Sequence, residues 1–330
     1  MERATRTIAI LLYPGGQSLD ISGPMEVFAL ATRQAQEQDP HSAPLYRLCF
    51  VARERGPVAM ASGMQLIADR GLDDDEPIDT LLISGGMGDA LDRARADRTL
   101  VAWVRAQASR VRRIGSICSG ALLLAEAGVL DGRRATTHWL DVAELRRRYP
   151  RVQVEADAIY VHDGPVWSSA GITAGMDLAL AMVAADHGRA LALQVAKRMV
   201  MFTRRSGGQS QFSQMLHAQA APDRFQELIA WLGANLQRPL DIEQLAAQVH
   251  MSPRHFRRRF QEAFGESPQR YLQRLRVDAA KALLEHTDHP LKRIAHDCGF
   301  ASEEAMRRAF LREHGIRPGE YRQRFAVSVD

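Results

Sequence analysis

The sequence predicts an α/β domain with a parallel sheet, followed by an all-α domain with two helix-turn-helix units. Three observations lead to this prediction. Residues 7–13 and 79–84 are largely apolar runs followed directly by Gly-rich turns, which is typical of buried parallel strands. Residues 204–222 are rich in Gly, Ser and Gln, as linkers are. Residues 245–271 recur, with substitutions, at residues 294–321.

Composition limits the class of protein. A chain of 330 residues with 46% hydrophobic content suggests two domains with ample core. Its three cysteines are odd in number and widely separated, which argues for a reducing compartment and against a disulfide framework or a zinc site. No signal peptide precedes Ile8, and no apolar run reaches the length of a membrane span. We therefore expect a cytoplasmic protein with no membrane partner, no metal site and no cofactor.

Alternating strands and helices in the first 200 residues predict helices on both faces of the sheet. The expected strands are residues 7–13, 45–52, 65–68, 79–84, 113–117, 135–137, 152–156, 159–162 and 166–168. The expected helices start near Gly23-Pro24 and cover residues 100–109, 121–127 and 172–186. We place the domain boundaries at residues 1–203, a linker at 204–222, and a second domain at 223–330.

Each copy of the repeat has the pattern of a helix-turn-helix unit. Ser252 is expected to cap the second helix of the first copy and Gly265 to end it, as Ser302 and Gly315 do in the second copy. The net charge of +4 is mild, so clustering of arginines rather than bulk charge indicates DNA. A basic face can also be only a solvated surface, but two copies in register argue against this. The side chains expected to contact DNA are Arg254, His255, Arg257, Arg258, Glu304, Arg307 and Arg308.

Cys118 lies at a predicted strand-to-helix turn, within residues 115–121. Such a turn exposes a side chain at the carboxyl edge of the sheet, where open α/β folds bind ligands. The helix N-terminus is expected to lower the pKa of the thiol, and small neighbours such as Ser119 offer N–H groups to a ligand. The turn is therefore a candidate nucleophile position. The alternatives are an inert buried cysteine, or inherited pocket geometry without turnover.

The last hundred residues resemble a known family. The stretch AHDCGFASEEAMRRAFLREHGIRPGEYR is similar to the AraC-type transcription regulator signature, and the first copy of the repeat fits the partner motif. The resemblance implies two helix-turn-helix units joined by a long helix, here near residues 268–285. Their recognition helices are then expected to enter successive major grooves.

The first domain resembles a second family. GSICSGALLLAEAGVLDGRRATTHW is similar to the PfpI-type, class I glutamine amidotransferase-like superfamily and especially to isocyanide hydratases, which implies a flavodoxin-like sandwich. The hydratases carry an acid in an LD-x-x-GP motif, which residues 19–24 match, so the resemblance assigns Asp20 as acid and Cys118 as nucleophile position. Both are vestigial catalytic candidates. Ser119 replaces the histidine that follows the cysteine in many PfpI-type proteases, which argues against peptidase chemistry.

Both resemblances together are those of the GlxA group of AraC-type regulators. They imply a transcription regulator, usually an activator and not an enzyme, whose first domain senses a small molecule, often a nitrogen-containing metabolite. Its expected partners are promoter DNA, the effector, RNA polymerase and a second copy of the chain. The expected effector-binding residues are Asp20, Gly86, Cys118, Ser119 and His138. Asp20 could instead cap a helix, and His138 could be a packed structural residue. The competing hypothesis is a cysteine-dependent hydratase or hydrolase with an attached DNA-binding domain.

Overall fold

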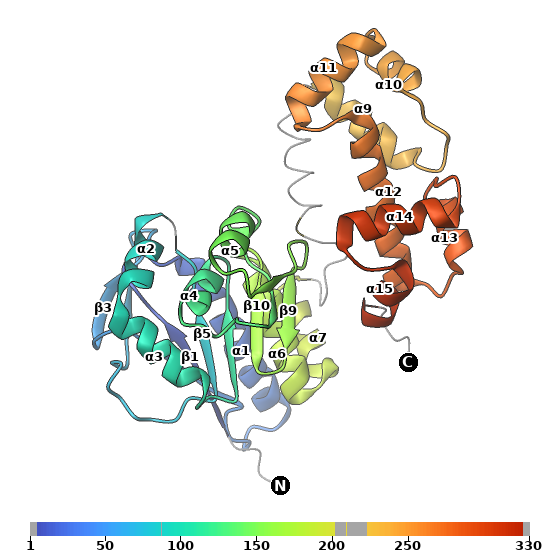
Figure 1. Ribbon diagram of the computed structural model, residues 1–330. Coiled ribbons are helices and arrows are strands. Elements are labelled where there is room, and N and C mark those ends of the chain that lie inside the picture. The colour runs from blue at the N-terminus through green and yellow to red at the C-terminus, as the bar shows by residue number, and fades with distance from the viewer. Residues whose placement is uncertain (1–4, 87, 202–208, 210–222, 326–330) are drawn as a thin grey trace. The chain divides into compact units, whose positions relative to one another are not determined.

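The computed structural model describes residues 5–86, 88–201, 209 and 223–325 (Figure 1). The chain divides into two compact units, Met1–Arg205 and Ser206–Asp330. The expected linker at residues 204–222 lies outside the described residues, apart from Gln209. The domain boundaries drawn from the sequence therefore stay a prediction.

Six strands of the described N-terminal residues form one sheet in the order β2-β1-β5-β6-β10-β9. Neighbouring strands are parallel except for β10 and β9, which are antiparallel. The strands are β1 (Arg6–Leu11), β2 (Tyr46–Val51), β5 (Thr80–Ile83), β6 (Arg113–Ser116), β9 (Tyr160–Asp163) and β10 (Val166–Ser169). The expected parallel-sheet α/β fold is confirmed, with one antiparallel strand at its edge.

Both faces of β1 are buried, which explains why its sequence is apolar without alternation. Ile8 and Ile10 point into one core, Ala9 and Leu11 into the other, and all four are fully buried. Helices cover both faces (Figure 1). Those over the first core are α1 (Ser18–Gln38), α6 (Ala174–His187) and α7 (Arg189–Arg198), and those over the second are α2 (Asp89–Ala96), α3 (Arg98–Ala108), α4 (Gly120–Glu126) and α5 (Val142–Arg148).

The start of α1 differs from the sequence prediction. Proline favours the first position of a helix, so the sequence predicts a start near Pro24. The helix instead begins at Ser18 and runs through Pro24. Ile21, which is fully buried in the first core, anchors the additional turn. This difference places Asp20 inside the first turn of a helix.

Two small sheets lie outside the main one. The unpredicted β3 (Gly56–Ala59) pairs antiparallel with β4 (Gln65–Ala68), and β7 (Arg134–Ala135) pairs parallel with β8 (Gln153–Val154). The strands predicted at residues 65–68, 135–137 and 152–156 therefore belong to these pairs. The helices α2, α5 and α7 were also not predicted, because their short apolar patterns do not stand out from the surrounding loops.

The C-terminal unit contains two helix-turn-helix units, each with its own core. The helices are α9 (Asp223–Ala234), α10 (Ile242–Gln248), α11 (Pro253–Phe264), α12 (Pro268–His286), α13 (Leu291–Asp297), α14 (Glu303–His314) and α15 (Pro318–Phe325). The expected long connecting helix is α12. Its Tyr271 and Leu272 belong to the first core, whereas Val277 and Leu284 belong to the second. One helix thus carries both units.

The two turns use the same left-handed position. His250 has φ 55° before α11, and Gly299 has φ 75° before α14. The amide of the next residue in each copy donates a 2.9 Å hydrogen bond to the preceding helix. A Cβ at Gly299 would lie 1.8 Å from the carbonyl oxygen of Leu236, so this turn admits glycine alone. No helix among the described residues is long and apolar enough to cross a membrane.

Candidate functional site

The elbow after β6 is sterically tight. Cys118 has φ 55°, an unusual backbone conformation for a non-glycine residue, and α4 begins two residues later at Gly120. A Cβ at Gly120 would lie 2.4 Å from the carbonyl oxygen of Ile83, so glycine is required for α4 to pass β5. Strained backbone of this kind is concentrated at functional sites. The predicted strand–turn–helix context of Cys118 is present.

Asp20 reaches the same edge of the sheet from α1. Its side chain is fully buried, and its Oδ2 accepts a 2.8 Å hydrogen bond from the amide of Gly85. Its Oδ1 has no hydrogen-bond partner among the described residues. Burial raises the pKa of Asp20 to about 7, and the Gly85 amide opposes this rise. Asp20 therefore bonds the loop after β5 and does not cap its own helix, so that alternative is wrong.

Gly85 is the point on which these side chains converge. A Cβ there would lie 2.6 Å from Asp20 Oδ2, 2.8 Å from Ser119 Oγ and 3.0 Å from Cys118 Cβ. Ser119 Oγ accepts a hydrogen bond from the Gly86 amide (3.1 Å) and donates one to the Gly86 carbonyl (2.9 Å). The structure thus brings together four of the five predicted effector-site residues.

The thiol of Cys118 is neutral at physiological pH. Burial raises its pKa to about 12, and the nearby carboxyl of Asp20 adds to the rise. The sequence predicted a lowered pKa from the helix N-terminus, and this is wrong for this site. Desolvation disfavours the thiolate more than the amides of a short helix favour it.

His138 is a more peripheral residue. It is half-buried, its Nδ1 accepts a 3.3 Å hydrogen bond from the Leu140 amide, and its pKa is lowered by burial. The preceding Thr137 donates a 3.0 Å hydrogen bond to the Cys118 carbonyl. In the described chain, no hydrogen bond or ring contact joins His138 to Asp20 or Cys118. His138 therefore lies in the neighbourhood of the elbow without being bonded to it.

Sequence reasoning missed two residues at this edge. Burial raises the pKa of Tyr13, and the carboxyl of Asp20 adds to the rise. The Tyr13 hydroxyl donates a 3.1 Å hydrogen bond to the Ser84 carbonyl. The carboxyl of Asp141 contributes to the raised pKa of Cys118. Tyr13 ends the first apolar run directly before Pro14, and that position at a strand end was the available signal. Asp141 follows an irregular segment and gave none.

A second candidate site is the exposed face of α11. Ser252 Oγ accepts a hydrogen bond from the His255 amide, and Pro253 occupies the first helical position. Phe256 and Phe260 are buried in the first core, which leaves the basic side chains outside. Exposed on this face are Arg254, His255, Arg257 and Arg258. Among described residues, Arg254 and Arg257 form no hydrogen bond or ion pair.

The corresponding face of α14 has a different charge pattern. Ser302 Oγ accepts a 3.1 Å hydrogen bond from the Ala305 amide, so the cap is the same as in α11. Arg307 donates a 2.6 Å hydrogen bond to Glu303. Glu304 and Arg308 are exposed and, within the described chain, have no such partner. All seven predicted DNA-contacting side chains are therefore on the outer faces of the two capped helices.

Comparison with known proteins assigns both units. Residues 6–185 match the DJ-1/PfpI family, and residues 245–324 match a helix-turn-helix domain. The chain belongs to the DJ-1/PfpI family. The HTH-type transcriptional regulator CdhR of Pseudomonas aeruginosa is 31% identical to it over 320 residues, which cover 96% of this chain and 88% of that protein.

Two further relatives match a little more than half of the chain. Isonitrile hydratase of Pseudomonas putida is 33% identical over 175 residues, covering 53% of this chain and 69% of the hydratase. The crystal structure of a THiJ/PfpI family protein from Pseudomonas syringae covers 60% of this chain and 76% of its own, with a TM-score of 0.52 and 27% identity.

This DJ-1/PfpI chain is a transcription regulator of the AraC type, in which a DJ-1/PfpI sensor domain is joined to a promoter-binding helix-turn-helix domain. Both family resemblances stated from the sequence are confirmed. The relative that covers nearly the whole chain is named a regulator, whereas the hydratase matches only about half of it. At the level of the whole chain, the similarity is therefore to a named transcription regulator.

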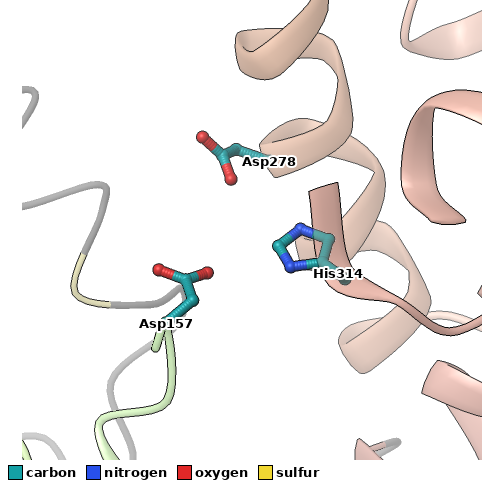
Figure 2. A group of neighbouring side chains, drawn as sticks. All are labelled: Asp157, Asp278 and His314. Carbon is teal, nitrogen blue, oxygen red and sulfur yellow. The ribbon is translucent and has the colours of Figure 1, made fainter. Parts of the chain in front are cut away.

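One further group of acidic and histidine side chains is drawn in Figure 2. Asp278 lies on α12 and His314 ends α14, both in the C-terminal unit, whereas Asp157 belongs to the N-terminal unit. Within either unit taken by itself, the described residues contain no group of three neighbouring metal-ligand side chains. Since neither unit supplies three ligands from this group by itself, we assign no metal site to it.

Proposed function

We propose that the N-terminal unit of this regulator binds a small metabolite and that this binding changes how the C-terminal unit acts on promoter DNA. The residues proposed to contact the metabolite are Asp20, Gly86, Cys118, Ser119 and His138. The observation that carries the proposal is the carboxyl of Asp20, which is fully buried and keeps Oδ1 without a partner in the described chain. A buried polar atom of this kind costs about 1–3 kcal/mol, which a ligand that donates to it would relieve.

The charge around Asp20 supports a nitrogen-containing effector. Burial and the Gly85 amide are the influences on its pKa, and no arginine or lysine of the described chain contributes. An anionic group placed there would meet a carboxyl and no cation. An ammonium or amine group would complement the carboxylate and shift it towards the ionised form.

We also propose that α11 and α14 are the recognition helices. The proposed contacts to bases and phosphates are Arg254, His255, Arg257, Arg258, Glu304, Arg307 and Arg308. These side chains are all exposed, and they lie on two helices with the same kind of N-terminal cap. The buried aromatic residues of both helices pack into the cores on the opposite side. Side chains near the start of a recognition helix reach base edges, and flanking arginines hold phosphates.

The regulator is further proposed to act in the cytoplasm as a homodimeric activator that contacts RNA polymerase. Two chains on paired DNA sites gain affinity because the second binding event becomes intramolecular. Sedimentation velocity of the full chain, with and without DNA, tests the oligomeric state. A monomer under both conditions at working concentration would contradict the dimer.

A thermal-shift screen tests the sensor function. Wild type, Cys118→Ala and Asp20→Asn are compared against amino acids, quaternary amines, simple nitrogen metabolites and isonitriles. A ligand at about 100 times its dissociation constant stabilises the fold by roughly 2.7 kcal/mol. We expect one compound whose stabilising effect persists in Cys118→Ala and weakens in Asp20→Asn. This compound is expected to be recovered chemically intact. If no compound distinguishes Asp20→Asn from wild type, the proposed site is wrong.

The alternative is a cysteine-dependent hydratase with an attached DNA-binding domain. Two observations favour it. Asp20 and Cys118 both lie beside Gly85, and 175 residues of the chain are 33% identical to isonitrile hydratase. The pKa of Cys118 near 12 opposes it, because the nucleophile would have to be the thiolate. A compound that wild type consumes and Cys118→Ala does not would establish this alternative.

A further inference from the structure

Arg254 and Glu304 occupy the same position in the two recognition helices. Both helices have 12 residues and follow a serine whose Oγ accepts a hydrogen bond from an amide three residues later. Both end at a left-handed glycine, with φ 73° in the first copy and 69° in the second. Arg254 and Glu304 are each the second residue of their helix, exposed on the first turn. Equivalent positions thus carry opposite charges.

The two recognition helices also differ in total charge. α11 carries four arginines against one glutamate, whereas α14 carries three arginines against three glutamates. Within α14, Glu303 is held by Arg307 at 2.6 Å. Glu304 has no ion pair in the part of the chain that the structure describes. The carboxylate of Glu304 is therefore the acidic group on this face that is available to contact DNA.

A carboxylate at the start of a recognition helix restricts what the helix can contact. Phosphates repel it, so it gains nothing from the backbone of DNA. In the major groove it needs a hydrogen-bond donor. Cytosine offers its N4 amino group, whereas adenine places the N7 acceptor beside its amino group and guanine offers only acceptors. An arginine side chain only donates hydrogen bonds, so it pairs with the acceptors O6 and N7 of guanine.

We infer that Arg254 reads guanine and Glu304 reads cytosine, so that the two helix-turn-helix units recognise different half-sites and bind DNA in one orientation. The inference rests on the proposed role of α11 and α14 as recognition helices. It assigns the non-specific attraction to DNA mainly to α11. It assigns to α14 a contact that increases sequence discrimination and lowers the affinity for DNA of any sequence.

Glu304 also stands where the helix dipole favours an acid, so a purely structural role must be separated from base reading. Glu303 provides the matched control, because it is one residue away, carries the same charge and lies in the same first turn. A helix-dipole or net-charge effect would make Glu303→Ala and Glu304→Ala behave alike. A base contact would make them differ.

The experiment selects binding sequences for the full chain from a library of randomised DNA duplexes. Wild type is expected to prefer a C·G pair at one position where Glu304→Ala shows no preference, a loss of roughly 5- to 150-fold in discrimination. Glu304→Ala is also expected to bind DNA without the site more tightly than wild type. Glu304→Gln is expected to shift the preferred base from cytosine to adenine, because an amide bonds adenine N6 and N7 together.

Specific results would overturn the inference. It fails if Glu304→Ala selects the wild-type sequence, if Glu303→Ala causes the same loss, or if Glu304→Gln keeps the cytosine. Thermal melting of each variant shows that the fold is retained. The proposed recognition helices are tested separately: if Arg254→Ala and Arg258→Ala leave DNA affinity unchanged, α11 is not a reader. If these two weaken binding and the Glu304 variants change nothing, only the present inference fails.

Discussion

Asp20 Oδ2 accepts a 2.8 Å hydrogen bond from the amide of Gly85, and this contact joins the first turn of α1 to the loop after β5. The other carboxyl oxygen, Oδ1, is buried and has no partner in the described residues. One oxygen thus fixes the side chain, and the other is the atom that we propose to meet the ligand. This hydrogen bond offsets part of the cost of burying the acidic side chain completely.

Asp20 is expected to make stability depend on pH. Its pKa of about 7 in the folded chain exceeds the usual 3.8, so the folded state holds a proton that the unfolded state has released between these values. The resulting stabilisation is fully present below about pH 4 and is lost as the pH rises through 7. Asp20→Asn stays neutral throughout and preserves a similar shape.

The measurement is the free energy of unfolding of wild type and Asp20→Asn between pH 4 and 8. The two are expected to be similar near pH 4, and the variant is expected to become more stable by on the order of 4 kcal/mol above pH 7. Other titrating groups are common to both chains and cancel in the difference. A difference that does not change with pH would show that the carboxyl is not desolvated.

Cys118 is expected to react slowly with alkylating reagents for a partly exposed cysteine. Its raised pKa leaves little thiolate at pH 8, and Asp20 is the second cause of that rise after burial. Asp20→Asn is therefore expected to speed alkylation at fixed pH, by less than about tenfold because burial remains. Peptide mass spectrometry separates Cys118 from the buried Cys49 and Cys298. An unchanged rate would mean that the Asp20 carboxyl does not act on the thiol.

The sequence was sufficient for features that depend on local pattern. Apolar runs identified the strands of the main sheet, and the positions of Ser252 and Ser302 identified the starts of α11 and α14. The elbow at Cys118 was recognisable because a strand, a small-residue turn and a helix follow one another directly. Each of these signals is contained within a few consecutive residues.

Features that depend on residues far apart in the chain could not be read in the same way. The bond between Asp20 and Gly85 joins positions 65 residues apart. The pKa of Cys118 is set by burial and by the Asp20 carboxyl, so the local helix N-terminus gave the wrong sign. The start of α1 depends on how Ile21 packs in the core. The local sequence does not show this packing, because Gly23-Pro24 indicates a helix start at a later residue.

Gly299 is expected to be indispensable for the second helix-turn-helix unit. Its φ of 75° and the 1.8 Å separation between an added Cβ and the Leu236 carbonyl oxygen both oppose any side chain. Gly299→Ala is expected to destabilise the unit by more than about 1 kcal/mol. The matched control is Gly319→Ala in α15, where nothing lies within 4 Å, and this change is expected to stabilise by about 0.4–1 kcal/mol.

Hydrogen exchange of the α13 and α14 amides in the full chain measures the effect of Gly299→Ala locally. Faster exchange is expected in Gly299→Ala, with wild-type or slower exchange in Gly319→Ala. Equal protection in all three chains would show that the Leu236 segment moves aside without cost.

Arg258 is expected to contribute to base recognition. Its side chain is 66% exposed and is held only loosely, with Glu262 at 4.0 Å and His255 Nδ1 at 3.4 Å. Arg258→Ala is expected to weaken operator binding by about 1–3 kcal/mol and to relax specificity at one position. Arg259→Ala is the matched control, because Arg259 is adjacent, carries the same charge and is bound to Glu262 at 2.9 Å.

The decisive comparison is the salt dependence of binding to operator and to unrelated DNA. A residue that contacts only phosphate lowers the salt slope by about 1 and weakens binding to both DNAs equally, whereas a base reader loses affinity mainly for the operator. We expect the second behaviour for Arg258→Ala and little change for Arg259→Ala. Equal losses on both DNAs would make Arg258 a phosphate contact and would leave sequence reading by α11 to Arg254 and His255.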